Sequence, residues 1–178
     1  MTIKVFEKVN GCFPLQLKQG DWCDLFTAED VKLTAPQANK MHIRKKGKNQ
    51  SQELRTRDVD FNWLTIPLGV CMEIPAGYEA YLLPRSSAFK KYGILQTNSI
   101  GIIDNSYAGP EDEWKLPVMA TREITIPKGT RIAQFRIQLK QQANFWQKLC
   151  WFFSSGITLE RVSSLSKKSR GGFGSTGK

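Results

Sequence analysis

The sequence contains a single histidine, four dispersed cysteines and no long hydrophobic run, and each shortage argues against a class of protein. The cysteines share no CxxC spacing and His42 is the one imidazole, which argues against a structural zinc site. No segment approaches the roughly 20 apolar residues that a membrane-spanning helix requires. The N-terminal segment lacks the apolar run of a signal peptide. We therefore expect a cytoplasmic protein with reduced thiols, in a bacterial, phage or host cell.

Acidic residues are also scarce, because 26 Lys and Arg stand against 16 Asp and Glu, a formal net charge of +10. This excess suits an anionic partner without identifying it. Much of it lies in the polar segment 40–57 and in residues 167–170. The first segment could neutralise nucleic-acid phosphates, but no aromatic residues interleave with its lysines. A solvated loop or hairpin is the favoured interpretation, and we expect no nucleic-acid partner.

Helical periodicity is rare, whereas short β-rich runs separated by Pro, Gly and Asn recur along the chain. The expected strands are 3–9, 31–35, 41–45, 61–66, 70–74, 79–83, 99–103, 115–120, 123–126, 131–139 and 158–162. Many short strands predict an antiparallel sandwich or barrel. A length of 178 residues corresponds to one ordinary domain.

Two short helices are expected, at 87–92 and 144–153. The second carries five large apolar side chains at helical spacing: Phe145, Trp146, Leu149, Phe152 and Phe153. Such a cluster could lie on a membrane surface, but the segment is too short to anchor the protein firmly. We expect it to pack against the domain or a neighbouring subunit, with no membrane partner.

The C-terminal nine residues combine glycines with one aromatic ring and two hydroxyls, in Arg170-Gly-Gly-Phe173-Gly-Ser175-Thr176-Gly-Lys178. Glycine amides can wrap phosphate oxygens, hydroxyls can donate to them, and a ring can stack on a base. This pattern indicates a lid over a nucleotide. By composition alone, a disordered Gly/Ser-rich terminus is the favoured interpretation.

Three further motifs precede this tail in a fixed order. They are Pro84-Arg85-Ser-Ser87, the run Asn98-Ser-Ile-Gly-Ile-Ile-Asp-Asn-Ser-Tyr-Ala-Gly109, and Gly129-Thr-Arg-Ile-Ala-Gln-Phe135. With the glycine-rich tail last, the chain resembles the trimeric dUTPases, the deoxyuridine triphosphate nucleotidohydrolases. The resemblance runs from about residue 78 to about residue 137 and resumes at the tail. A fifth motif is weaker, because only Asp24-Leu25 remains of the family's Ala-Gly-x-Asp-Leu.

The resemblance implies an all-β, jelly-roll-like dUTPase fold with a short helix and a flexible C-terminal arm. Residues 1–165 would form the β domain, with insertions around 27–62 and 141–155. Residues 166–178 would form the arm that closes over the active site. The implied assembly is a homotrimer with active sites shared between subunits, and the implied reaction is Mg²⁺-assisted hydrolysis of dUTP to dUMP and pyrophosphate.

Hydrolysis of a triphosphate requires a positioned water, a proton acceptor and fixed positive charge. Asp104 is the candidate acceptor, since it ends an expected strand before a turn. An aspartate there could merely start the turn, but its spacing from Asn98 and Tyr107 matches the family. By resemblance, it orients the water that attacks the α-phosphorus. A carboxylate with a pKa of about 3.9 is a weak base, so positioning matters more than basicity.

Recognition of uracil is expected from the hairpin before this aspartate. The backbone of 99–103, which includes Ile102 and Ile103, can present fixed donors and acceptors to the base edge, and Asn98 adds a side-chain amide. By resemblance, Asn98 contacts the uracil ring, and Tyr107 packs under the deoxyribose and excludes a 2′-hydroxyl.

The other expected substrate contacts come from the phosphate-binding motifs and the arm: Arg85, Ser86, Ser87, Lys115, Gln134, Lys168, Arg170, Phe173, Gly174, Ser175 and Thr176. Arg85 could instead form an ion pair between subunits. The family's arm has arginine five positions before the phenylalanine, where this chain has Lys168, so either Lys168 or Arg170 could reach the γ-phosphate. Asp24 could hold magnesium through a water.

Two alternatives stay open. A dCTP deaminase has a similar fold, but it commonly has a glutamate where this chain has Pro117. A nucleotide-gated regulatory dUTPase could bind a protein partner through 40–57 or 144–153.

Overall fold

The computed structural model describes residues 1–18, 20–45, 53–154 and 156–171 of the chain. Within these residues it contains fifteen strands and two short helices, so the predicted all-β class is confirmed. The strands are β1 (Thr2–Glu7), β2 (Leu15–Gln16), β3 (Cys23–Phe26), β4 (Val31–Leu33), β5 (Gln37–Lys45), β6 (Glu53–Asp60), β7 (Trp63–Pro67), β8 (Val70–Glu73), β9 (Tyr78–Pro84), β10 (Ile94–Gln96), β11 (Gly101–Asp104), β12 (Lys115–Ala120), β13 (Ile124–Ile126), β14 (Arg131–Leu139) and β15 (Thr158–Val162). The helices are α1 (Ala88–Tyr92) and α2 (Phe145–Phe152).

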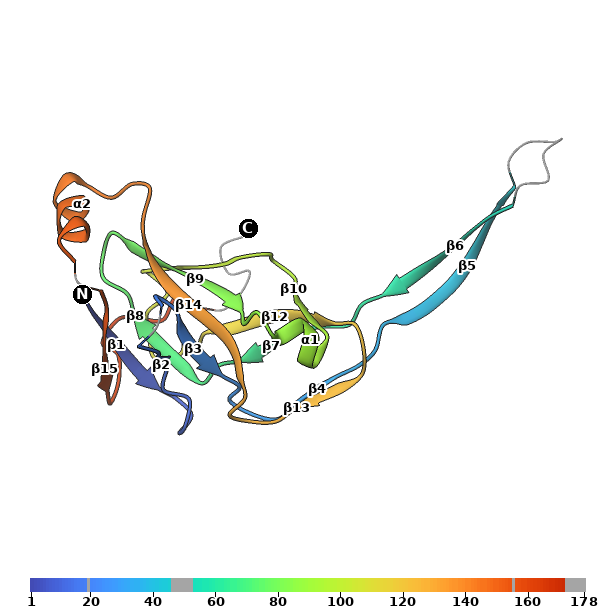
Figure 1. Cartoon of the computed structure of the whole chain (residues 1–178), viewed down its shortest axis with the longest axis horizontal. Coiled ribbons are helices and arrows are strands. Elements are labelled where there is room, and N and C mark those ends of the chain that lie inside the picture. The colour runs from blue at the N-terminus through green and yellow to red at the C-terminus, as the bar shows by residue number, and fades with distance from the viewer. Residues whose placement is uncertain (19, 46–52, 155, 172–178) are drawn as a thin grey trace.

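A five-stranded antiparallel sheet in the order β11-β9-β14-β3-β2 forms the centre of the molecule (Figure 1). Two three-stranded sheets accompany it, in the orders β15-β1-β8 and β10-β12-β7, together with the pair β13-β4. In the first of them, β15 runs parallel to β1, whereas β8 is antiparallel to it. Four of the sequence motifs reach into this sheet, in β3, β9, β11 and β14.

The core forms where the sheets pack together. In β9 the side chains alternate, so that Tyr78, Ala80 and Leu82 are buried and their neighbours are half-buried. Trp114 and Phe135 are fully buried and meet edge to face, with ring centroids 5.2 Å apart. These buried side chains belong to one continuous hydrophobic cluster.

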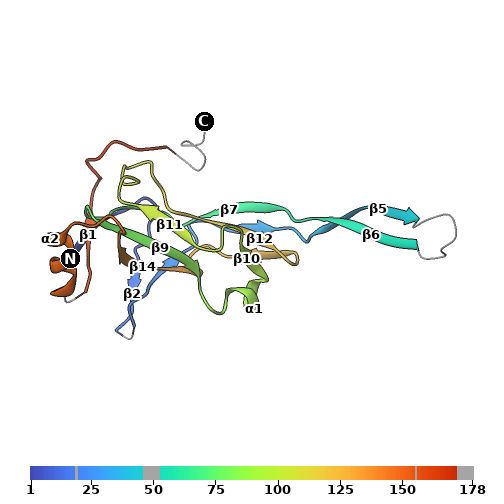
Figure 2. The ribbon, with the colours of Figure 1, turned by 90° about the horizontal axis from the view of Figure 1, so that it is seen from above.

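Strands β5 and β6 form a long hairpin that projects away from the rest of the molecule (Figures 1 and 2). Within the described residues it pairs with no other strand. Four strands lie outside the predicted set: β2, β3, β6 and β10. The sequence of β6 is polar, because a hairpin that leaves the body needs no apolar face, and periodicity therefore gave no signal there.

Both helices lie where they were predicted, each slightly shorter. Asn144 caps α2 in a capping box with Gln147, through two reciprocal bonds of 2.9 Å. The expected packing against the domain is made by Trp151, whose ring lies 5.7 Å from that of Tyr78. The aromatic side chains at either end of α2 are exposed, including Trp146 at 70%. Across the ranges that the structure describes, no helix is long and apolar enough to cross a membrane.

Candidate active site

Asp104 ends the edge strand β11, opposite Glu79 of β9. Its side chain is partly exposed and accepts two hydrogen bonds. The backbone N–H of Ser106 donates to Oδ1 over 2.7 Å, and Nζ of Lys140 donates to Oδ2. Burial alone would raise the pKa of Asp104, but the hydrogen bonds from Lys140 and Ser106 lower it to about 2. The carboxylate is therefore ionised at neutral pH.

Lys140 is a neighbour of Asp104 that no sequence motif indicated. It follows β14 directly, and its Nζ also donates to Oδ1 of Asn105. The antiparallel pairing of β14 with β9 brings it to Asp104, which is 36 residues earlier in the chain. Only the register of the sheet places this cation at the carboxylate.

Tyr107 lies in the turn after Asp104. Its backbone N–H donates to the carbonyl of Asp104 over 2.9 Å, and its hydroxyl donates to the carbonyl of Glu113 over 2.9 Å. Burial raises the pKa of Tyr107 to about 12, so the phenol stays protonated. Tyr107 is half-buried, and hydrogen bonds restrain both its backbone and its hydroxyl. A restrained ring suits the predicted role of packing under the deoxyribose.

Asn98 lies beyond the opposite end of β11, in a turn where Ser99 adopts a left-handed φ of 59°. The Asn98 side-chain oxygen accepts a 2.7 Å hydrogen bond from Nε2 of Gln96. The predicted strand at 99–103 begins at Gly101 instead. Ile103 packs on the core, while Ile102 is 62% exposed. Among the described strands β11 pairs only with β9, so its second edge has no strand partner in the described part of the chain.

A second cluster of motif residues forms around Asp24, which is 2% exposed. Its Oδ1 lies 3.1 Å from Nε of Arg85, which follows β9. Its Oδ2 accepts a 3.3 Å hydrogen bond from Nη1 of Arg131, at the start of β14. The ion pair of Arg85 is thus made within the chain. Within the described residues the Nη nitrogens of Arg85 have no hydrogen bond, and both can donate to an oxyanion.

Three further predicted residues lie close to Arg85. Gln134 of β14 sits opposite Asp24 on one side and Leu83 on the other, and its Nε2 donates to the Pro84 carbonyl over 3.4 Å. Ser86 is exposed, and Ser87 is the N-cap residue of α1 without a side-chain capping bond. Four of the expected phosphate contacts, Arg85, Ser86, Ser87 and Gln134, therefore lie at one end of β9.

The Asp104 cluster and the Arg85 cluster lie at opposite ends of β9. Asp104 pairs with Glu79, whereas Arg85 follows the other end of the strand. Arg85 lies six positions after Glu79, which corresponds to roughly 20 Å of extended chain. One chain alone therefore does not unite these two groups.

The remaining predicted contacts fall in β12 and the arm. Lys115 begins β12 opposite Pro67, and no bond to Asp104 or Arg85 is found for it in the described part of the chain. Arg170 donates from Nη1 to Oγ of Ser106 over 2.9 Å, while Lys168 is exposed. The predicted contacts at Phe173, Gly174, Ser175 and Thr176 lie outside the described residues.

No group of three or more His, Cys, Asp or Glu side chains that could hold a metal ion occurs among the residues that the structure describes. Both carboxylate oxygens of Asp24 face guanidinium groups. These pairs favour a role for Asp24 in holding the arginines. The predicted water-mediated magnesium contact of Asp24 stays a prediction.

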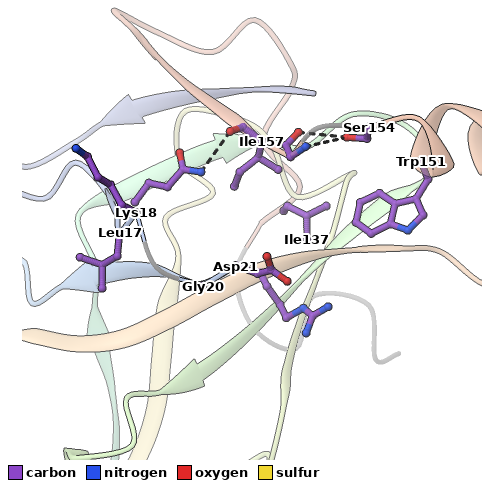
Figure 3. A pocket seen from close by; sticks show the side chains of 11 residues that line it. Leu17, Lys18, Gly20, Asp21, Ile137, Trp151, Ser154 and Ile157 are labelled. Carbon is purple, nitrogen blue, oxygen red and sulfur yellow. Dashed lines mark hydrogen bonds between the residues drawn. The ribbon is translucent and has the colours of Figure 1, made fainter.

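A pocket of about 950 Å³ lies elsewhere, between the segment after β2 and the end of α2 (Figure 3). Leu17 and Lys18 line one side in this view, and Trp151 and Ser154 line the other. None of the predicted site residues lines it. The pocket is therefore separate from the catalytic motifs.

Comparison with known proteins agrees with the motif pattern. The sequence model of the dUTPase family matches residues 59–151. The SPbeta prophage-derived deoxyuridine 5'-triphosphate nucleotidohydrolase YosS of Bacillus subtilis is 40% identical over 162 residues, 91% of this chain and 87% of that protein. The deoxyuridine 5'-triphosphate nucleotidohydrolase of Dinoroseobacter shibae is 35% identical over 133 residues, 73% of this chain and 77% of that protein.

Solved structures share the fold. The dUTPase of Streptococcus mutans superposes with a TM-score of 0.60 at 18% identity, covering 81% of this chain and 99% of that one. A mutant dUTPase of Staphylococcus bacteriophage 80alpha, solved with dUpNHpp, superposes with a TM-score of 0.56 at 19% identity. This second superposition covers 99% of this chain and 98% of that one.

Proposed function

Because this chain belongs to the dUTPase family, we propose that it is a dUTP diphosphatase, which hydrolyses dUTP to dUMP and pyrophosphate. The observation that carries the assignment is the ionised Asp104 at the end of an edge strand, followed by the anchored Tyr107. A carboxylate with a pKa of about 2 is a poor proton acceptor from water. It is a good hydrogen-bond acceptor, so its proposed role is to orient the nucleophile.

In the proposed reaction, Asp104 accepts a hydrogen bond from a water whose oxygen attacks the α-phosphorus. The new P–O bond forms as the bond from that phosphorus to the α,β-bridging oxygen breaks. Pyrophosphate leaves with that oxygen, and the proton of the water is released to solvent. Asp104 holds the water in line with the breaking P–O bond, and such orientation can account for a large part of a rate enhancement. Lys140 must then share or release Oδ2 as the water binds.

Base recognition is assigned to the open edge of β11. On the edge of β11 opposite to β9, the backbone around Ile102 and Ile103 pairs with no described strand, and Asn98 adds an amide at the turn. Backbone donors and acceptors at fixed positions can pair with the uracil edge and leave an analogue's groups unpaired. Tyr107, held through its hydroxyl by the Glu113 carbonyl, supplies the surface under the deoxyribose.

Phosphate binding is assigned to Arg85, Ser86, Ser87 and Gln134, with Lys115, Lys168, Arg170 and the tail residues Phe173, Gly174, Ser175 and Thr176 as further contacts. Since the Asp104 and Arg85 clusters lie roughly 20 Å apart along β9, one chain does not enclose a single triphosphate with both. We therefore assign the working form as a homotrimer in which each site combines clusters from different subunits. Residues 1–165 form its β domain and 166–178 its arm.

Two segments are assigned as insertions into this β domain, around 27–62 and around 141–155. The β5–β6 hairpin falls within the first and α2 within the second. The family match begins at residue 59, at the end of the hairpin.

Magnesium is the expected cofactor. A dUTPase of the S. aureus phage phi11 coordinates a structural Mg(II) ion. No closed ligand set occurs among the residues described here, which fits an ion bound mainly by substrate phosphates and water. When bound, it would neutralise charge that develops on the leaving pyrophosphate.

The proposal is tested by measuring pyrophosphate release from dUTP with magnesium, alongside dCTP, dTTP and UTP. Turnover of dUTP that far exceeds turnover of the other three supports the assignment. Release of ammonia from dCTP would instead indicate a deaminase. Retention of full activity in Asp104→Asn would remove Asp104 from the mechanism.

A further inference from the structure

The loop between β11 and β12 contains a second aspartate, Asp112, whose environment is unlike that of Asp104. Asp112 is 1% exposed and accepts hydrogen bonds only from backbone N–H groups within the described residues. Gly109 donates to Oδ2 over 2.8 Å. Arg170 donates to both oxygens, over 3.0 and 2.9 Å, and Gly171 donates to Oδ1 over 3.2 Å. One buried carboxylate thus joins the catalytic loop to the base of the C-terminal arm.

Neighbouring contacts fit the same two segments together. The backbone N–H of Glu111 donates to Oγ of Ser169 over 3.0 Å. A Cβ on Gly109 would come within 2.3 Å of the Cα of Ser169, so only glycine permits this approach. The Leu165 side chain, just before the arm, is 5% exposed, so the chain is packed against the domain at this point. The arm base, residues 169–171, is therefore a packed part of the structure.

The docking of the arm base directs the Arg170 side chain toward the catalytic carboxylate. Nη1 of Arg170 donates to Oγ of Ser106 over 2.9 Å, and the backbone N–H of Ser106 donates to Oδ1 of Asp104 over 2.7 Å. Lys168, the competing cation, has no hydrogen bond or ion pair within the described residues, although both cations are exposed. A guanidinium has five donors in a planar fork, so it can bind Ser106 and still offer donors to a phosphate.

We propose that Asp112 is a positioning residue for dUTP hydrolysis, which fixes the arm base on the catalytic loop and thereby places Arg170, rather than Lys168, beside Asp104. This inference rests on the proposed function. Its physical basis is that a carboxylate binding three backbone N–H groups restrains the arm before substrate arrives. Substrate binding then does not have to order the arm base, so the entropic cost of binding the triphosphate is lower.

The first test measures kcat and KM for dUTP in Asp112→Asn, Gly109→Ala and Arg170→Ala, with Lys167→Ala as the matched control. In Asp112→Asn, the side-chain oxygen still accepts a hydrogen bond, but the side-chain NH₂ group faces backbone N–H donors. In Gly109→Ala, the added Cβ would clash with Ser169 while the Asp112 side chain stays unchanged. Each of the three changes should lower kcat/KM by about 10- to 100-fold. Lys167 lies in the same segment and pairs with Glu73 over 3.3 Å, so its loss should change kcat/KM less than about twofold.

The second part of this test is the double variant Asp112→Asn/Arg170→Ala. If Asp112 acts through Arg170, the double variant should be no slower than the slower single variant. Multiplicative losses would show that Asp112 has only a general structural role and would overturn the proposal. A Lys168→Ala variant with a larger loss than Arg170→Ala would overturn the choice of cation.

Limited trypsin digestion reads out the docking without any activity. The peptide bond between Arg170 and Gly171 should be protected in the wild type, because the backbone N–H groups of both residues donate to Asp112. Mass spectrometry should show cleavage there at least about tenfold faster in Asp112→Asn and Gly109→Ala. Equal cleavage in all proteins would overturn the proposal. A protected wild type that does not hydrolyse dUTP would instead refute the proposed function and leave the docking intact.

Discussion

The two ends of β9 carry the two halves of the candidate site, and they are built in different ways. At the Arg85 end, a carboxylate that is 2% exposed sits between two guanidinium groups, and neighbouring strands of one sheet supply the residues. At the Asp104 end, the carboxylate is partly exposed, and a loop, a lysine and the arm base surround it. The Arg85 end is fixed by the sheet, whereas the Asp104 end is assembled from segments that loops bring together.

The Arg85 end is the more rigid of the two. Arg85 is held by a buried ion pair and by a 3.0 Å hydrogen bond from its N–H to the carbonyl of Ile132. Removing one partner of a buried ion pair leaves an unpaired charge, so a substitution at the Arg85 end should destabilise the fold strongly. The Asp104 end offers separate contacts that can be removed one at a time. The following predictions test this contrast.

The largest effect is expected for Asp104→Asn. The amide keeps the shape of the side chain but loses its charge, so the attacking water is no longer oriented. Turnover of dUTP should fall by about 10²- to 10⁴-fold, with binding of a non-hydrolysable dUTP analogue retained. Pyrophosphate release and calorimetry measure the two quantities. Loss of analogue binding in parallel would show that Asp104 serves binding and not the chemical step.

The next effect concerns stability at the other end of β9. Asp24→Ala leaves two guanidinium groups without their carboxylate and should lower the free energy of unfolding by about 3–5 kcal/mol. Denaturant unfolding measures it. The control is Glu29→Ala, an exposed carboxylate whose removal should change stability by less than about 0.5 kcal/mol. A stable Asp24→Ala protein with weakened dUTP binding alone would mean that the ion pairs serve orientation and contribute little to folding.

Mixing two inactive variants tests whether the two ends meet between subunits. Asp104→Asn and Arg85→Ala, unfolded and refolded together in equal amounts, should regain about a quarter of the wild-type sites if trimers form at random. Each mixed trimer then holds one site with both native residues. Pyrophosphate release measures the recovery. A mixture that stays inactive, although mixed trimers are detected by native mass spectrometry, would place both residues in one subunit's site.

The smallest effect is expected for Lys140→Met. The pKa of Asp104 is lowered from 3.8 to about 2, so Lys140 stabilises the fold above pH 4, and this contribution is lost as the pH falls from about 4 to 2. Because the Asp104 side chain is 41% exposed, the loss at pH 7 should stay below about 1 kcal/mol. The Asp104 pKa should move up toward 3.8, as NMR titration of the carboxyl carbon would show. An unchanged pKa would exclude Lys140 as its partner.

Sequence patterns predicted most of the strands because buried alternation recurs in them. β12, β14 and β15 have the predicted bounds. β3 escaped prediction although Asp24 was singled out, since four residues with a charge among them carry no period. Asn98, Tyr107 and Asp104 were found through their motif, and the structure places them on or next to β11. Lys140 and Asp112 belong to no motif, so their roles depended on contacts between distant segments.

The order of short motifs along the chain was enough to predict the reaction, because those motifs supply the side chains and backbone groups that the reaction requires. The all-β class could also be predicted from the chain, because short apolar alternations punctuated by turn residues favour strands. Which of these groups lie together depends on how the strands pair and pack. The strand register put Lys140 on Asp104 and put Asp104 at the end of β9 far from Arg85, and a buried carboxylate fixed the arm base. These juxtapositions join residues far apart in the chain, where local preference has no influence and packing decides.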